Sequence, residues 1–232
     1  MALIGSKGVF MASLAKAINL GGVNCYLITA TDGYILIDTG FIGKRVQLDH
    51  SLEDAGCLPG KLKLIVLTHG DSDHADNCVY LRNKYGCKIA MHPSDAGMVE
   101  RGDMSWNRKP KADKYSILFR VLGFFVKNFI GGKKFEKFTP DFLIDEDFDL
   151  SPFGTNARII HIPGHSKGSI GLLCEDRAFY CGDFAYNLPG MQFIDDMGDH
   201  NKSMEKLQQL GIETIYPGHG KPFPMTALVR RG

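Results

Sequence analysis

The sequence of 232 residues lacks the features that mark membrane, secreted and repetitive proteins. No apolar run reaches the roughly 20 residues that a membrane-spanning helix requires, and there is no low-complexity segment and no repeat at a solenoid period. The N-terminus is only mildly apolar and is interrupted by Lys7 and Lys16, so we expect neither a signal peptide nor a membrane span. With 44% hydrophobic residues, the chain has enough apolar material for one well-packed domain over residues 1–232.

The sequence also lacks paired cysteine motifs and an excess of charge of one sign. Its six cysteines form no C-x-x-C pair, which indicates free buried thiols and a reducing, cytoplasmic location. The net charge of +1 gives no reason to expect a nucleic-acid partner. Residues 101–137, however, contain ten Lys or Arg against three Asp or Glu. This basic segment indicates either a binding region for an anionic group or a solvated loop.

Short apolar runs alternate with helical patterns through most of the chain. The runs at 25–28 and 34–37 are separated by Asp32-Gly33, a strong signal for a β-hairpin. The other expected strands lie at 62–67, 88–91, 158–162, 169–174, 178–181 and 213–216, with an acidic hairpin at 143–150. The expected helices lie at 44–56, 75–85 and 202–210. Alternating strands and helices predict an α/β fold.

Residues 100–140 interrupt this alternation. Apolar residues between Tyr115 and Phe129 recur at helical spacing, and others make the same helix apolar on most sides. Gly131-Gly132 would end it. The segment therefore predicts a helical insertion, either a core helix or a lid that offers an apolar surface to an acyl or aromatic substrate.

Side chains that coordinate divalent metals follow four of the expected strands. They are His69, Asp71, Asp73, His74, His165, Asp183 and His219. The first four lie within six positions directly after the strand at 62–67, so one loop could supply ligands to two ions roughly 3.5–4 Å apart. Imidazole and carboxylate ligands suit zinc, iron or manganese. The absence of cysteine from these motifs argues against a structural zinc site.

From about residue 20 to residue 224, the order of these motifs resembles the metallo-β-lactamase-fold hydrolases. The resemblance rests on Asp38, the cluster at 69–74, His165, Asp183 and His219. It implies a four-layer αβ/βα sandwich, with the site at the joined edges of two sheets. It also implies that Asp38 orients a ligand imidazole.

Carried over residue by residue, the resemblance implies a ligand set for two divalent metals. His69 and His165 would bind the first metal, and Asp183 would bridge both. The ligands of the second metal would be Asp73, His74 and His219. Zinc is the first expectation for both metals, with iron or manganese as alternatives.

Asp71 departs from the family pattern, which usually has His at this position, so the motif is HxDxDH in place of HxHxDH. An aspartate adds a negative charge and a harder oxygen ligand on a shorter side chain. It would reach the metal through local adjustment or through a water. The flavodiiron oxygen reductases, which have the same fold, carry Glu here and hold iron, so iron and manganese stay candidates.

The leading hypothesis is a metal-dependent hydrolase that uses a metal-bridging hydroxide to cleave an ester, lactone or thioester bond. Asp73 would orient the hydroxide and accept its proton. Tyr186 lies three residues after Asp183, where N-acyl homoserine lactonases of this fold have a Tyr that contacts the substrate carbonyl; a core or rim Tyr is the other interpretation. A small molecule with an apolar tail and an anionic group would suit both the apolar helix and the basic segment.

Two other functions stay open. The first is a di-iron redox protein resembling the metal domain of the flavodiiron proteins, although this chain is too short to contain their flavodoxin domain as well. The second is a non-catalytic metal-binding module whose site has decayed, for which Asp71 is the only motivation. An oligomer is compatible with each of these functions.

Overall fold

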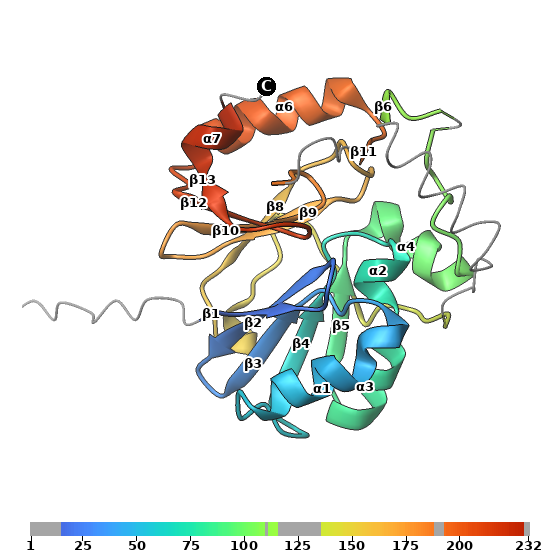
Figure 1. The fold of residues 1–232 in the computed structure, drawn as a ribbon, viewed down its shortest axis with the longest axis vertical. Helices are drawn as coiled ribbons and strands as arrows, with labels where there is room; N and C mark the ends of the chain where they lie inside the picture. The colour runs from blue at the N-terminus through green and yellow to red at the C-terminus, as the bar shows by residue number, and fades with distance from the viewer. Residues whose placement is uncertain (1–14, 110, 116–135, 188–192, 230–232) are drawn as a thin grey trace, which may run out of the picture.

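The computed structural model describes residues 15–109, 111–115, 136–187 and 193–229 (Figure 1). The apolar helix expected between Tyr115 and Phe129 lies, apart from Tyr115, outside the described residues. The helical insertion over 100–140 therefore stays a prediction, as does the single domain over residues 1–232.

Two sheets face each other in the centre of the molecule (Figure 1). The first contains, in spatial order, β1 (Ala15–Asn19), β2 (Asn24–Ala30), β3 (Gly33–Ile37), β4 (Leu62–Val66), β5 (Lys88–Met91) and β7 (Phe142–Leu143). The second contains β13 (Phe223–Pro224), β12 (Thr214–Pro217), β10 (Ala178–Gly182), β9 (Ile170–Leu173) and β8 (Arg158–His161). A short third sheet pairs β6 (Lys114–Tyr115) with β11 (Phe193–Ile194). The hairpin expected at Asp32-Gly33 is confirmed by the antiparallel pairing of β2 with β3.

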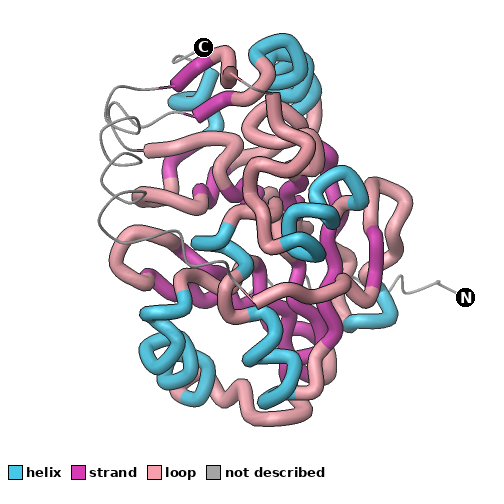
Figure 2. Tube along the Cα trace, turned by 90° about the vertical axis from the view of Figure 1, so that its right-hand side faces the viewer, coloured by secondary structure: helices cyan, strands magenta, loops and turns pink. Residues whose placement is uncertain are grey.

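Helices cover the outer face of each sheet (Figures 1 and 2). Three hydrophobic cores fill the space between the layers. On the first sheet lie α1 (Arg45–Glu53) and α3 (Cys78–Tyr85); on the second lie α6 (Met197–Gln208) and α7 (Met225–Val229). Alternation along β2 shows why the layers form, because Leu27 packs toward the helices while Ile28 packs against the second sheet. The third core joins α6 and α7 to the second sheet. This order of helix, sheet, sheet and helix is the expected four-layer sandwich.

Hydrogen bonds join the two sheets at one edge. The Nδ2 atom of Asn24 donates to the carbonyl of Pro217 at 3.1 Å, and the hydroxyl of Tyr26 donates to the same carbonyl at 2.7 Å. On the other side, the backbone N–H of Ile170 donates to the carbonyl of Thr68 at 2.9 Å. These bonds hold the loops that follow β4, β8 and β12 in a fixed relation, which is what a site shared by both sheets requires.

The hairpin expected at 143–150 is wrong. Phe142–Leu143 forms β7, which pairs in parallel with β5, and the acidic residues that follow form turns. The carboxylates of Asp145 and Asp149 accept from the backbone N–H groups of Asp147 and Ser151, two residues further along the chain. Such local bonds compete with a strand ladder, and they explain why the acidic run does not form a hairpin.

The helices differ from expectation mainly at their starts. The helix expected at 75–85 is divided into α2 (Ser72–Ala75) and α3, because buried Asn77 donates its side-chain amide to the carbonyls of residues 39–41. Helix α6 begins before residue 202, since Asp196 accepts from the N–H of Asp199 and caps it. Helix α4 (Pro93–Arg101) and the one-turn helices η1 (Ile42–Lys44) and η3 (Ser151–Phe153) were not expected. Among the described helices, none has both the length and the hydropathy to cross a membrane, and all six cysteines are free and buried as expected.

Candidate metal centre

Five strands, β3, β4, β8, β10 and β12, end at the edge where the two sheets meet. The side chains that follow these strands include every ligand expected from the sequence, and their ligand atoms fall into three groups, each spanning no more than 4.8 Å. The first group is His69, Asp71 and His165, and the second group is Asp73, His74 and His219. The third group, His69, His74 and Asp183, links the other two. The structure therefore brings together all seven predicted ligands.

The spacing of ligand atoms fits one four-coordinate ion in each of the first two groups. Oδ2 of Asp71 lies 3.5 Å from Nε2 of His69 and 3.2 Å from Nε2 of His165. In the second group, Nε2 of His219 lies 3.3 Å from Oδ2 of Asp73. Ligands about 2.0–2.1 Å from a tetrahedral ion are roughly 3.3 Å apart. Asp71 therefore reaches the first group directly, without the adjustment expected for its shorter side chain.

Asp183 lies between the two groups. Its Oδ1 atom is 3.2 Å from Nε2 of His74, and its Oδ2 atom is 3.3 Å from Nε2 of His219. It also shares the third group with His69. A carboxylate in this position can offer one oxygen to each of two neighbouring ions, which is the role the sequence predicts for it.

Three buried atoms of the cluster make no hydrogen bond within the chain. They are Nε2 of His69, Nε2 of His74 and Oδ1 of Asp183. Leaving a buried polar atom unsatisfied costs about 1–3 kcal/mol, so three such atoms facing one point indicate a missing partner. Two imidazoles and a carboxylate together accept a divalent cation, and the residues present therefore fit the expected metals.

Asp38 orients two of the imidazoles, one directly and one through Thr68. Its Oδ2 atom accepts from Nδ1 of His74 at 2.8 Å and from the Thr68 hydroxyl at 2.8 Å. Because Thr68 gives its only hydroxyl hydrogen to Asp38, its oxygen accepts from Nδ1 of His69 at 2.9 Å. Both rings therefore carry their proton on Nδ1 and direct Nε2 into the cluster. Thr68 was not expected from the sequence.

The other two imidazoles are oriented by backbone carbonyls. Nδ1 of His165 lies 3.1 Å from the carbonyl oxygen of Phe193, and Nδ1 of His219 bonds to the carbonyl oxygen of Gly22. All four histidines thus share one tautomer and one orientation relative to the cluster.

Burial and the neighbouring carboxylates act in opposite directions on these imidazoles. Burial lowers the pKa of His74, but the carboxylates around it, Asp183 foremost, raise that pKa well above its usual value. The same opposition raises the pKa of His219 to about 10. In the first group, burial lowers the pKa of His165. The carboxylates of the second group therefore favour a positive charge beside them, which either a proton or a metal cation can supply.

Asp71 pairs with Arg108, a residue that sequence reasoning missed. The NH2 atom of Arg108 donates to Oδ1 of Asp71 at 2.6 Å, while Oδ2 of Asp71 faces the two imidazoles of its group. Burial raises the pKa of Asp71, but the charge of Arg108 and the hydrogen bonds from His165 and His69 together outweigh burial and hold that pKa well below its usual value. The carboxylate is therefore ionised. The only signal in the sequence was the basic segment, which does not name a partner.

Tyr186 lies at the cluster, as expected. Its hydroxyl donates to Oδ2 of Asp183 at 2.9 Å and lies 3.5 Å from Nδ1 of His165. Burial and the charge of Asp183 raise the pKa of Tyr186 well above its usual value, so the hydroxyl keeps its proton. Because that proton points to Asp183 here, direct contact of Tyr186 with a substrate carbonyl stays a prediction.

Two features outside the expected motifs shape the site. The buried carboxylate of Asp95, on α4, accepts from the Ser166 hydroxyl at 2.6 Å and from the N–H of Gly168 at 2.8 Å, which fixes the loop that carries His165. A Cβ atom at Gly218 would lie 2.5 Å from Oδ1 of Asp183, so the residue before His219 must be a glycine.

Curated proteins similar to this chain include hydrolases. The acyl-coenzyme A thioesterase MBLAC2 of Homo sapiens is 26% identical over 226 residues, which cover 89% of this chain and 76% of that protein. The hydroxyacylglutathione hydrolase GloC of Haemophilus influenzae is 28% identical over 166 residues, which cover 70% of this chain and 66% of that protein.

Solved structures share the fold at low sequence identity. A metallo-beta-lactamase from Cronobacter sakazakii has a TM-score of 0.66 and 21% identity, and the likeness covers 94% of this chain and 81% of that one. The TTHA1623 protein in a di-iron-bound form has a TM-score of 0.66 and 22% identity, covering 93% and 96%. The family model described as the metallo-beta-lactamase superfamily matches residues 18–219. With the match extending over most of the chain and the ligand cluster at its expected edge, this chain belongs to the metallo-beta-lactamase superfamily.

Proposed function

We propose that this chain hydrolyses thioesters whose acyl group is apolar and whose thiol carries negative charge. Membership of the superfamily makes the chain a metallo-hydrolase. The observation that carries the narrower proposal is a pocket with several apolar side chains in its lining that shares a wall, Tyr186, with the metal centre.

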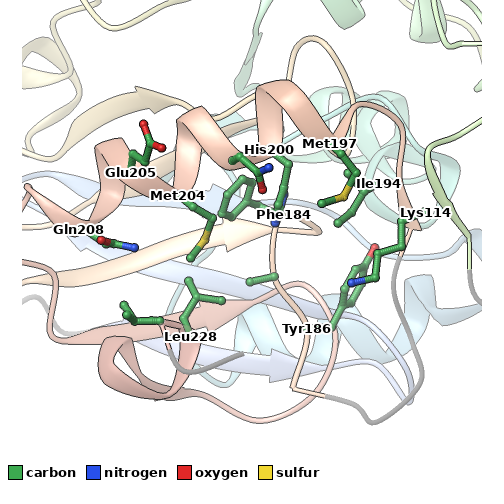
Figure 3. A pocket seen from close by; sticks show the side chains of 13 residues that line it. Lys114, Phe184, Tyr186, Ile194, Met197, His200, Met204, Glu205, Gln208 and Leu228 are labelled. Atoms are coloured by element: carbon green, nitrogen blue, oxygen red, sulfur yellow. The ribbon is translucent and has the colours of Figure 1, made fainter. Parts of the chain in front are cut away.

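The pocket has a volume of about 420 Å³, within the range of small-molecule sites. Polar and apolar surface contribute about equally to its lining. The apolar side chains include Phe184, Ile194, Met197, Met204 and Leu228, and the polar ones are Lys114, His200, Asn201, Glu205 and Gln208. Figure 3 shows Met204 and Leu228 on opposite sides of the pocket, with Tyr186 and Lys114 at its other end. Tyr186 reaches Asp183, so an acyl chain in the pocket would place its carbonyl near the cluster.

Two cations among the described residues of the basic segment are paired with carboxylates. Arg108 pairs with Asp71, and Lys109 pairs with Asp113 and Asp196. Lys114, however, is exposed and lines the Tyr186 end of the pocket. It would contact the anionic thiol portion of a substrate whose acyl chain lies further inside.

The chemistry at the scissile bond follows from the residues of the cluster. Two divalent metals, zinc in the first place, would lower the pKa of a coordinated water and polarise the carbonyl. The first group would hold one metal and the second group the other, with Asp183 shared between them. Asp73 is the most exposed of the predicted ligands, with 23% of its side chain accessible, so its carboxylate can orient an incoming water and accept its proton. Asp38 and Thr68 keep the imidazoles directed inward.

The names of two relatives support the thioester in particular. An acyl-coenzyme A thioesterase and a hydroxyacylglutathione hydrolase both act on an acyl group joined to an anionic thiol. Their substrates differ in the acyl group, and the apolar side chains in the pocket of this chain favour the longer, more hydrophobic one.

The test is a comparison of acetyl-, octanoyl- and palmitoyl-coenzyme A, an S-acyl glutathione and an N-acyl homoserine lactone as substrates. We expect kcat/KM to be highest for a long-chain thioester. Leu228→Trp, which fills the pocket, should lower kcat/KM for the long-chain substrates about tenfold and leave acetyl-coenzyme A within about twofold. Val46→Trp, at an exposed position on α1, is the control and should change neither.

If Leu228→Trp lowered kcat/KM equally for acetyl-coenzyme A and for the long-chain thioesters, with an unchanged melting temperature, the pocket would be excluded as the acyl site. Preference for the lactone over every thioester would exclude the thioesterase assignment. The metal content of the same preparation separates the redox alternative, because two irons and a visible absorption band would favour it and a colourless zinc protein would exclude it.

A further inference from the structure

Arg108 is held rigidly against the first ligand group. Its Nε atom donates to the carbonyl of Met104 at 3.0 Å, and its NH1 atom donates to the carbonyl of His165 at 2.7 Å. The guanidinium lies over the ring of Phe193, 5.1 Å from its centroid. Only 10% of the Arg108 side chain is exposed. An arginine fixed by two carbonyls, a carboxylate and a ring is part of the site and not a mobile surface cation.

The loop that carries Arg108 is fixed as well. The backbone N–H of Lys109 donates to both oxygens of Asp195, at 3.2 and 3.1 Å. The side-chain amide of Asn107 donates to the carbonyl of Ser94 at 3.1 Å. Arg108 cannot leave the first group without breaking contacts on both sides of it.

The guanidinium lies near the position that a metal in the first group would occupy. Its NH2 atom is 3.5 Å from Nε2 of His165, and that nitrogen is the expected ligand atom. The same NH2 atom binds Oδ1 of Asp71, whose other oxygen faces His69 and His165. A fixed positive charge this close to a divalent cation is repulsive, and burial strengthens the repulsion.

The second group has no such cation. Among the described residues, no Lys or Arg forms an ion pair with Asp73 or Asp183, whose charged partners are imidazoles. The two groups therefore differ in charge. Asp71 and Arg108 together have no net charge, like the neutral histidine that the family usually has at position 71.

We propose that Arg108 acts as a fixed counter-charge that lowers the affinity of the first group for a divalent cation, so that the second group binds metal more tightly. The Asp71–Arg108 pair then replaces one neutral ligand. This inference concerns metal binding alone, so its test does not depend on the substrate proposed above.

The test is a zinc titration of the full chain after removal of metal by a chelator, followed by calorimetry and chelator competition. The wild type should bind two zinc ions with clearly separated affinities. Arg108→Gln should tighten the weaker site about tenfold and leave the tighter site unchanged. Arg108→Lys, which keeps the charge, should stay within about threefold of the wild type. Lys109→Gln removes a neighbouring charge that does not contact Asp71 and should also leave both affinities unchanged.

The sign of the effect separates this proposal from a purely orienting role. If Arg108 only holds Asp71 in place, Arg108→Gln should weaken the first site, as loss of a ligand's hydrogen-bond partner usually does. Weaker or unchanged binding in Arg108→Gln would therefore overturn the proposal. A second variant pair tests the same charge without the Asp71 carboxylate. Asp71→His should weaken the first site because Arg108 then lacks its counter-charge, and adding Arg108→Gln should restore it. If the double variant bound zinc at the first site no more tightly than Asp71→His, the proposal would likewise be overturned.

Discussion

The two ligand groups contain the same kinds of side chain, yet their carboxylates have different partners. Asp71 of the first group is bonded to Arg108, whereas the ion pairs of Asp73 in the second group, among the described residues, are with imidazoles at 3.3 and 3.8 Å. Replacing the usual histidine by Asp71 therefore adds no net negative charge to the first group, because Arg108 neutralises the carboxylate. The ligand at position 71 has to be judged together with Arg108.

The imidazoles of the two groups also differ in how they are oriented. Asp38 binds His74 of the second group directly, but it reaches His69 of the first group only through the neutral hydroxyl of Thr68. A hydrogen bond to an ionised acceptor is roughly twice as strong as a neutral one and makes the ligand nitrogen more basic. Both differences favour tighter metal binding by the second group.

Asp183 is the residue whose loss should affect both groups at once, because it shares a ligand cluster with His69 of the first group and His74 of the second. We expect Asp183→Ala to lower turnover about a thousandfold or more and to reduce bound metal below one ion per chain. Elemental mass spectrometry and a thiol-release assay measure the two effects. Asp32→Asn, in an exposed turn with 77% of its side chain accessible, is the control. Two retained metals in folded Asp183→Ala would show that Asp183 is not a ligand.

Variants of Asp38 and Thr68 should weaken the two groups to different extents. Asp38→Asn removes the ionised acceptor of His74 and should weaken the tighter site about 10- to 100-fold. Thr68→Val keeps the side-chain shape but removes the hydroxyl between Asp38 and His69, so it should weaken only the first site, by about tenfold.

Zinc titration of both variants gives the two affinities, and thermal unfolding checks that each variant is folded. If Thr68→Val weakened the second site as much as the first, the assignment of Thr68 to His69 alone would be wrong.

Much of the fold was predictable because its signals are local. The turn at Asp32-Gly33 and the apolar runs that became β3, β4 and β10 follow from period and turn chemistry within a few residues. The acidic run at 143–150 was misread because Asp145 and Asp149 bind their own backbone. The split between α2 and α3 depends on the buried amide of Asn77, which reaches residues nearly 40 positions away in sequence.

The candidate site likewise contains residues that the sequence predicts and residues that it does not. The ligands follow strand ends, so their convergence could be expected from the topology of the two sheets. Arg108, Thr68 and Asp95 could not be found in this way. Arg108 meets Asp71 across 37 residues, and Asp95 meets Ser166 across 71, through loops whose paths no local pattern determines.

The smallest expected effect concerns Tyr186, which contacts both groups through Asp183 and His165. Tyr186→Phe removes one hydrogen bond to an ionised carboxylate, a contribution of about 1.5–3 kcal/mol at most. We expect bound metal to stay at the wild-type level and kcat to fall about two- to tenfold, because the metals would still hold Asp183 in place.

A larger effect would change the role of Tyr186. Loss of one donor to a developing oxyanion typically costs about 100- to 1,000-fold in kcat. A fall of that size with unchanged KM and metal content would mean that the hydroxyl turns from Asp183 to the substrate carbonyl during the reaction. A two- to tenfold fall would mean that Tyr186 only positions Asp183. Since Tyr186 also lines the pocket between α6, α7 and β11, a rise in KM confined to long-chain thioesters would instead assign it to acyl binding.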